Sequence, residues 1–170
     1  VTEHITEVAR RFATEGYFAI VPDLYHRAGR NRTAPYSDLE EVMKLRASAT
    51  DTTIQADLVA AIEYLRSNSS SEHAPIGIVG YCMGGRVAFL AAARVPGLTG
   101  AAIYYGGNMT VVREGEPEGF PRLIDEAVNI ECPVIAFFGR SDHMIPPDQL
   151  REIQNSLDTH VKDSEVVLYD

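Results

Sequence analysis

Segments with the composition of β-strands alternate with helix-like segments along the whole of this 170-residue chain. The β-rich segments are 17–21, 76–80, 101–105, 133–139 and 164–169. The residues between them carry apolar side chains mainly at helical spacing. Strands that alternate with helices predict a single α/β domain over residues 1–170, with a mostly parallel sheet and helices on both faces. In such sheets the chemistry lies at the carboxyl ends of the strands.

Polar residues ahead of apolar runs predict where helices begin. Ser37 and Glu40 have the spacing of a capping box, and Asp51 is placed to cap a further helix. Gly16 is expected to end the first helix, because glycine readily adopts the left-handed conformation found there. The short apolar strand at 76–80 is of the kind that is buried on both faces.

Composition restricts the partners and the location of the protein. A formal net charge of -9 argues against a nucleic-acid surface, which needs clustered lysine and arginine. The longest apolar stretch, 87–93, is too short to cross a membrane, and the N-terminal residues lack the zones of a signal peptide. Two cysteines, Cys82 and Cys132, are too few for a disulfide scaffold and suit a reducing compartment. We therefore expect a cytoplasmic protein.

The stretch "GYCMGGR" at 80–86 places a cysteine between a predicted strand and a predicted helix. A G-x-C-x-G turn at such a junction forces its central residue into a strained conformation and presents the side chain above the sheet. Cys82 would lie at a helix N-terminus, whose partial positive charge favours the thiolate. The backbone N–H of Met83 would point to where an oxyanion forms. This pattern predicts a nucleophile elbow, against the alternative of an inert buried thiol.

An acidic partner follows a later strand. Asp142 comes after the β-rich segment 133–139, and prolines that open another helix follow it. The order nucleophile then acid is the order used by α/β-hydrolases. The alternative is that Asp142 caps a helix or forms a turn.

The stretches that carry a resemblance to a known family extend over nearly the whole chain. They are "IVPDLYHRAG", "DLVAAIEYLRS", "GYCMGGR", "AIYYGG" and "AFFGRSDHMIPP". Together they resemble the dienelactone hydrolases, or carboxymethylenebutenolidases, which are α/β-hydrolases with a cysteine nucleophile. The resemblance implies that Cys82 is the nucleophile and that Asp142 orients a histidine. It also implies hydrolysis of a small lactone or ester through an acyl-enzyme, with no metal and no organic cofactor.

The chain departs from the family pattern at both ends. The family's catalytic histidine follows the last strand, where this sequence stops at Asp170, so the triad histidine is not present in this chain. The sequence also begins just beyond a loop that carries a glutamate in the family. We therefore expect an α/β-hydrolase domain that is incomplete at both ends, inactive or impaired in this form, and able to self-associate through its incomplete sheet.

None of the five histidines is an evident replacement for the missing base. His160 is predicted at the wrong edge of the sheet, and His143 adjoins the acid that would have to orient it. His26 follows a predicted strand and so would lie on the correct edge. His4 is expected on a helix and His73 in a polar loop, and neither has metal-ligand spacing to its neighbours.

Two other functions remain open. The first is a non-catalytic α/β-hydrolase-like binding protein, in which alkylation of Cys82 would leave function unchanged. The second is a redox sensor that uses Cys82. Cys132 is predicted at the start of a strand, at the far edge of the sheet from Cys82, so the two should not pair. Tyr104 and Tyr105 end a strand at the catalytic edge and are candidates for lining a pocket.

Overall fold

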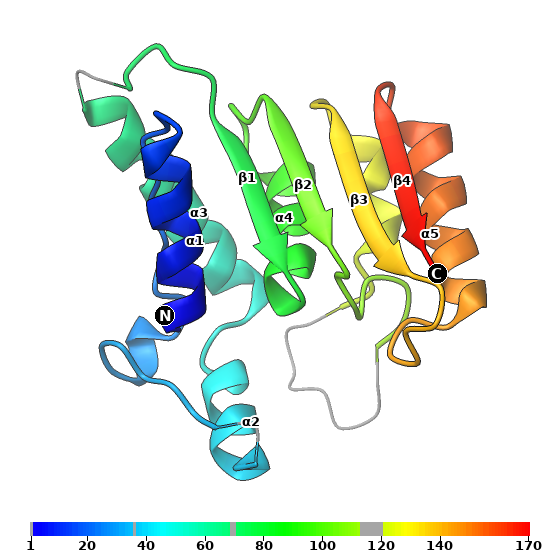
Figure 1. The fold of residues 1–170 in the computed structure, drawn as a ribbon, viewed down its shortest axis with the longest axis horizontal. Coiled ribbons are helices and arrows are strands. Elements are labelled where there is room, and N and C mark those ends of the chain that lie inside the picture. The colour runs from blue at the N-terminus through cyan, green and yellow to red at the C-terminus, as the bar shows by residue number, and fades with distance from the viewer. Residues whose placement is uncertain (1, 36, 69–70, 113–120) are drawn as a thin grey trace. The chain divides into compact units, whose positions relative to one another are not determined.

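The computed structural model describes residues 2–35, 37–68, 71–112 and 121–170, which form two compact units. The first unit comprises described residues up to 74, and the second comprises those from 75 onward. The first unit contains α1 (Glu3–Thr14), the 3-10 helix η1 (His26–Ala28), α2 (Leu39–Ala47) and α3 (Asp51–Ser67) (Figure 1). The interpretation of residues 1–170 as one domain stays a prediction.

The second unit is built on a parallel sheet. Its strands are β1 (Gly77–Tyr81), β2 (Gly100–Tyr104), β3 (Val134–Gly139) and β4 (Ser164–Tyr169). They lie in the order β1-β2-β3-β4 and every neighbouring pair is parallel. All four strands therefore end at one edge, as their arrowheads show in Figure 1. The predicted α/β fold with a parallel sheet is confirmed.

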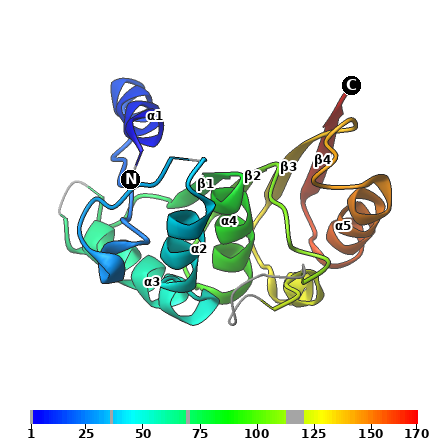
Figure 2. The ribbon, with the colours of Figure 1, turned by 90° about the horizontal axis from the view of Figure 1, so that it is seen from below.

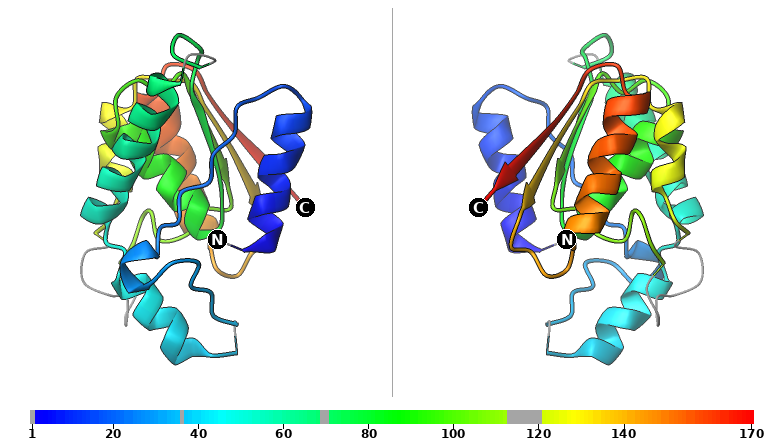
Figure 3. Two further views of the ribbon diagram at one scale, coloured as in Figure 1. Left: turned by 90° about the vertical axis from the view of Figure 1, so that its left-hand side faces the viewer. Right: turned by 90° about the vertical axis from the view of Figure 1, so that its right-hand side faces the viewer.

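Helices of the second unit cover one face of this sheet. They are α4 (Met83–Arg94), the 3-10 helix η2 (Ile124–Asn129) and α5 (Pro147–His160), and Figures 2 and 3 show them on the same side of the strands. Side chains alternate in burial along β3: Ala136 and Phe138 are buried, whereas Ile135 and Phe137 are only half-buried. This period of two is typical of a strand with one more deeply covered face.

Aromatic side chains stack across all four strands near their carboxyl ends. The ring centroids of Tyr81 and Tyr104 are 4.8 Å apart, and those of Tyr104 and Phe137 are 4.5 Å apart. Tyr169 continues the series, with its centroid 6.5 Å from that of Phe137. Each of the first two pairs occupies directly opposed positions of the parallel register. These cross-strand contacts stabilise the edge of the sheet from which the site residues project.

The prediction of a strand at 17–21 is wrong. This segment has no regular secondary structure, and it does not join the sheet formed by the described strands. A β-rich sequence forms a strand only where a second strand satisfies its backbone groups.

The prediction that the strand at 76–80 is buried on both faces is also wrong. This strand, β1, lies at an edge of the described sheet, and most of its residues are half-buried.

The predicted helix caps are displaced by one residue. Asp38, not Ser37, caps α2, because its carboxylate accepts a hydrogen bond of 3.1 Å from the N–H of Glu41. Thr50, not Asp51, caps α3, and Asp51 is instead the first residue of that helix. Adjacent polar residues compete for the same cap, and the backbone conformation decides which one is used. The predicted end of α1 is nearly correct: the helix ends at Thr14, and Gly16, just beyond it, has a φ of 91°.

An ion-pair cluster ties the loop around η1 to helix α3 within the first unit. The guanidinium of Arg27 donates two hydrogen bonds of 2.7 Å to the carboxylate of Asp57. The ring of His26 lies 3.2 Å from the same carboxylate. Burial raises the pKa of Asp57, but the hydrogen bonds from Arg27 and His26 outweigh this effect and leave the pKa below its ordinary value.

Replacement of Asp57 by asparagine should destabilise the protein in a pH-dependent manner. A carboxyl whose pKa is lower in the folded state stabilises that state above the unfolded pKa of 3.8, and the stabilisation is lost as the pH falls below this value. We expect D57N to lower the free energy of unfolding by about 1 kcal/mol near neutral pH. Urea denaturation at a series of pH values should show the difference shrinking in acid.

The matched control is Glu7→Gln. Glu7 forms an exposed pair with Arg10, at 3.4 Å. Its replacement should change the free energy of unfolding by less than about 0.5 kcal/mol at any pH. A loss in D57N that is equally large in acid and at neutral pH would contradict the electrostatic origin of the stabilisation.

Candidate active site

Cys82 occupies a sharp turn between β1 and α4. Its backbone has φ 55° and ψ -118°, a conformation that is strained for a residue with a side chain. The N–H of Cys82 donates to the carbonyl of Tyr104 at 3.0 Å, and the carbonyl of Cys82 accepts from Gly85 and Arg86 at 2.9 and 3.2 Å. The side chain is exposed, in agreement with the prediction that this turn presents it above the sheet. The alternative of a buried thiol at this position is wrong.

Glycines make the turn possible because backbone segments approach one another closely. A Cβ atom on Gly80 would lie 1.8 Å from the carbonyl oxygen of Gly84, and one on Gly85 would lie 2.6 Å from that of Tyr104. A Cβ on Gly106 would lie 2.9 Å from the backbone nitrogen of Arg86. The strand, the helix and the segment after β2 are therefore in backbone contact. The turn motif in the sequence indicates Gly80 and Gly84, whereas the signal for Gly106 is limited to the pair of glycines after "YY".

Met83 is the first residue of α4 and directly follows Cys82. Its peptide N–H lies at the positive end of the helix dipole, next to the sulfur-bearing residue. This position is the one that the prediction of an oxyanion donor requires. The role itself stays a prediction.

Asp142 lies in the turn that follows β3, at the same edge of the sheet as Cys82. Its Oδ1 accepts a hydrogen bond of 2.9 Å from the N–H of Met144, and its carbonyl accepts one of 3.1 Å from Ile145. Only β2 separates β1 from β3, so the two strands are about 10 Å apart. The turn contacts agree with the alternative that Asp142 forms a turn, and its role in orienting a histidine stays a prediction.

The structure gives the histidines different surroundings. His160 ends α5 just before β4, at the amino edge of the sheet, as predicted. His143 is exposed beside Asp142. The prediction that His26 follows a strand is wrong, because residues 17–21 form no strand, and the His26 ring instead contacts Asp57. His4 lies on α1, as predicted.

Arg86 is a buried cation that the sequence analysis did not single out, although it lies in the quoted turn motif. It is 2% exposed and follows Cys82 by one helical turn. Its guanidinium donates to the carbonyls of Asn108 and Pro121. Arginine is rarely buried, so nothing in the local sequence indicated this placement.

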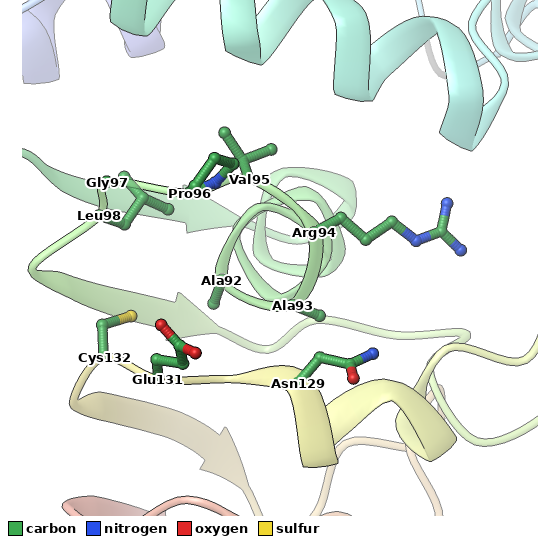
Figure 4. Close-up of a pocket in the computed structure, with 10 residues that line it drawn as sticks. All are labelled: Ala92, Ala93, Arg94, Val95, Pro96, Gly97, Leu98, Asn129, Glu131 and Cys132. Atoms are coloured by element: carbon green, nitrogen blue, oxygen red, sulfur yellow. The ribbon is translucent and has the colours of Figure 1, made fainter.

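The opposite edge of the sheet carries a pocket of about 230 Å³ (Figure 4). It lies between the end of α4 and the residues that lead into β2 and β3, and it is lined by residues 92–98, 129, 131 and 132. Burial raises the pKa of the Cys132 thiol there. Both cysteines are free, so the prediction that Cys82 and Cys132 do not pair is confirmed.

The described part of the chain holds no group of three histidine, cysteine or carboxylate side chains that could bind a metal ion. None of its helices combines the length and the apolar character needed to cross a bilayer.

A parallel sheet whose first strand leads through a strained cysteine turn into a buried helix defines an α/β-hydrolase-type fold. The sequence model of the dienelactone hydrolase family matches residues 1–170, and the chain belongs to that family. The resemblance inferred from the motifs is therefore confirmed.

Individual relatives agree with this assignment. The chain is 31% identical to a "Putative carboxymethylenebutenolidase" of Yersinia pestis over 99% of its own length and 61% of the relative's. It is 30% identical to the carboxymethylenebutenolidase of Pseudomonas putida, over 86% of this chain and 58% of that one. The crystal structure of a "Putative Dienelactone Hydrolase" from Klebsiella pneumoniae superimposes with a TM-score of 0.75 at 31% identity, covering all of this chain and 69% of that chain. The chain thus spans about 60% of the length of these curated relatives.

The close backbone contact at the turn gives a matched pair of substitutions. Gly80→Ala would place a Cβ inside the contact with Gly84, so we expect a loss of about 3 kcal/mol in the free energy of unfolding. Gly84→Ala meets no atom within 4 Å and lies in a helix, so stability should be unchanged or rise by up to about 1 kcal/mol. Urea denaturation measures both, and equal stabilities for the two variants would contradict the contact.

Proposed function

We propose that the protein hydrolyses a carboxylic ester or lactone of a small molecule through a covalent acyl-enzyme on Cys82. The observation that carries this proposal is the exposed Cys82 side chain on a strained strand-to-helix turn at the carboxyl edge of the sheet. Backbone strain of this kind is maintained where a side chain must be presented for chemistry. Membership of the dienelactone hydrolase family supports the same class of reaction.

The reaction divides into two acyl transfers. The thiolate sulfur of Cys82 attacks the ester carbonyl, and the carbonyl oxygen takes up the negative charge of the tetrahedral intermediate. The N–H of Met83 donates to this oxygen. Collapse of the intermediate breaks the bond to the alcohol oxygen, which leaves with a proton, and forms a thioester. Water then attacks the thioester, releases the carboxylic acid and restores the thiol.

A base is needed in both steps, and the proposed role of Asp142 is to orient it. A carboxylate that accepts from an imidazole N–H keeps the ring in the tautomer that can take a proton from the nucleophile or from water. The position of Asp142 after β3, one strand removed from the elbow, supports this role. The chemistry needs neither a metal ion nor an organic cofactor.

The test is the formation of the acyl-enzyme, followed by intact-mass spectrometry during reaction with p-nitrophenyl acetate. We expect one acetyl group on the wild-type chain, carried by Cys82, and none at that position in Cys82→Ala. Cys132→Ala is the matched control and should acylate normally, because the Cys132 thiol is buried at the other edge of the sheet.

Acylation separates the hydrolase from the binding-protein alternative. If Cys82 reacts with the ester no faster than a free thiol such as glutathione does, the hydrolase proposal fails. A non-catalytic binding protein would give that result, and alkylation of Cys82 would then leave ligand binding unchanged.

A further inference from the structure

Arg86 lies in the first turn of α4, directly after the cysteine turn. Its backbone N–H donates to the carbonyl of Cys82 at 3.2 Å, so the two residues share the first turn of α4. The residue is 2% exposed. Burial of a cation is unfavourable unless its N–H groups find acceptors, so the contacts of this side chain must offset that cost.

Two acceptors of its side chain lie on separate parts of the connection between β2 and η2. The Nε of Arg86 donates to the carbonyl of Asn108 at 3.1 Å, and Nη2 donates to the carbonyl of Pro121 at 2.8 Å. Nearby, the carbonyl of Met109 accepts from the N–H groups of Leu123 and Ile124 at 2.8 and 2.9 Å. Arg86 therefore joins residues on both sides of this connection to the helix that begins at the elbow.

The segment held in this way is in contact with the turn itself. The carbonyl of Tyr104 accepts from the N–H of Cys82, and Gly106 packs against the backbone of Gly85. Tyr105 and Asn108 have φ values of 39° and 57°, which are uncommon for residues other than glycine. Such conformations persist only where the surrounding structure enforces them. The buried guanidinium of Arg86 donates to the carbonyl of Asn108, so it is placed to hold Asn108 in this conformation.

We propose that Arg86 is a positioning residue for the acyl transfer: it holds residues 105–109 against the elbow, so that this segment forms a fixed wall beside Cys82. The proposal rests on the hydrolase function proposed above. Lysine cannot fully replace this arginine, because one ammonium group cannot align with two carbonyls as a planar guanidinium does. A substrate ester needs the wall for its orientation, whereas a small alkylating agent needs only the exposed sulfur.

The experiment compares two rates at Cys82 in four proteins. The proteins are wild type, Arg86→Met, Arg86→Lys and Arg94→Met. The rates are acylation by p-nitrophenyl acetate and alkylation by iodoacetamide. We expect R86M to acylate about 10- to 100-fold more slowly than wild type, because loss of substrate orientation is costly, while alkylation stays within about 2-fold. R86K should recover part of the acylation rate.

Arg94→Met is the matched control for the loss of a charged contact on the same helix. Arg94 lies at the far end of α4 and pairs with Glu126 through contacts of 2.6 and 2.5 Å. Its removal should lower stability and leave both rates unchanged. Hydrogen exchange followed by mass spectrometry gives a readout that does not depend on activity: peptides that cover 105–112 should exchange faster in R86M and not in R94M.

Three results would overturn the positioning role. They are an R86M protein that acylates like wild type, an R86M protein whose alkylation falls as much as its acylation, and an R94M protein with the same kinetic defect. The first shows that the wall does not matter, the second that Arg86 acts on the sulfur or the fold, and the third that destabilisation alone explains the effect. Failure of the hydrolase function is distinct, since Cys82 of the wild type would then acylate no faster than a free thiol.

Discussion

The site depends on backbone-to-backbone contact at the start of α4. No side chain fits between Gly80 and Gly84, or between Gly85 and the segment at Gly106, so β1, α4 and the residues after β2 meet without intervening atoms. This contact fixes Cys82 in its strained conformation and lets its N–H reach the carbonyl of Tyr104. The stacked rings of Tyr81 and Tyr104 brace the same two strands immediately before the turn.

Much of the second unit could be predicted from sequence because its elements are short and strongly patterned. The four strands found in the sheet were all expected, and the turn at Cys82 was recognisable from its glycines and from the apolar runs on either side. Local composition is sufficient there, since each strand is apolar and each is followed by a helix or a turn signal. The placement of Asp142 at the carboxyl edge followed from chain order and parallel topology alone.

The parts that could not be predicted depend on contacts between residues distant in sequence. Residues 17–21 have strand composition, yet strand formation requires a partner that composition does not specify. The choice of Asp38 over Ser37 as a cap depends on backbone angles. The burial of Arg86 depends on carbonyls 22 and 35 residues further along the chain. A charged residue beside an apolar stretch is expected at the surface unless the carbonyls that accept its hydrogen bonds are known.

The two cysteines show how position in one sheet gives the same side chain different chemistry. Cys82 is exposed at the carboxyl edge, at the start of a helix whose dipole stabilises negative charge. Cys132 is buried at the amino edge, where burial raises the pKa of its thiol. The proposed acyl transfer needs a thiol that a substrate can reach, and of these two cysteines the one at the carboxyl edge is exposed. The direction of the strands therefore places one thiol at the edge where this chemistry is proposed and the other, buried, at the opposite edge.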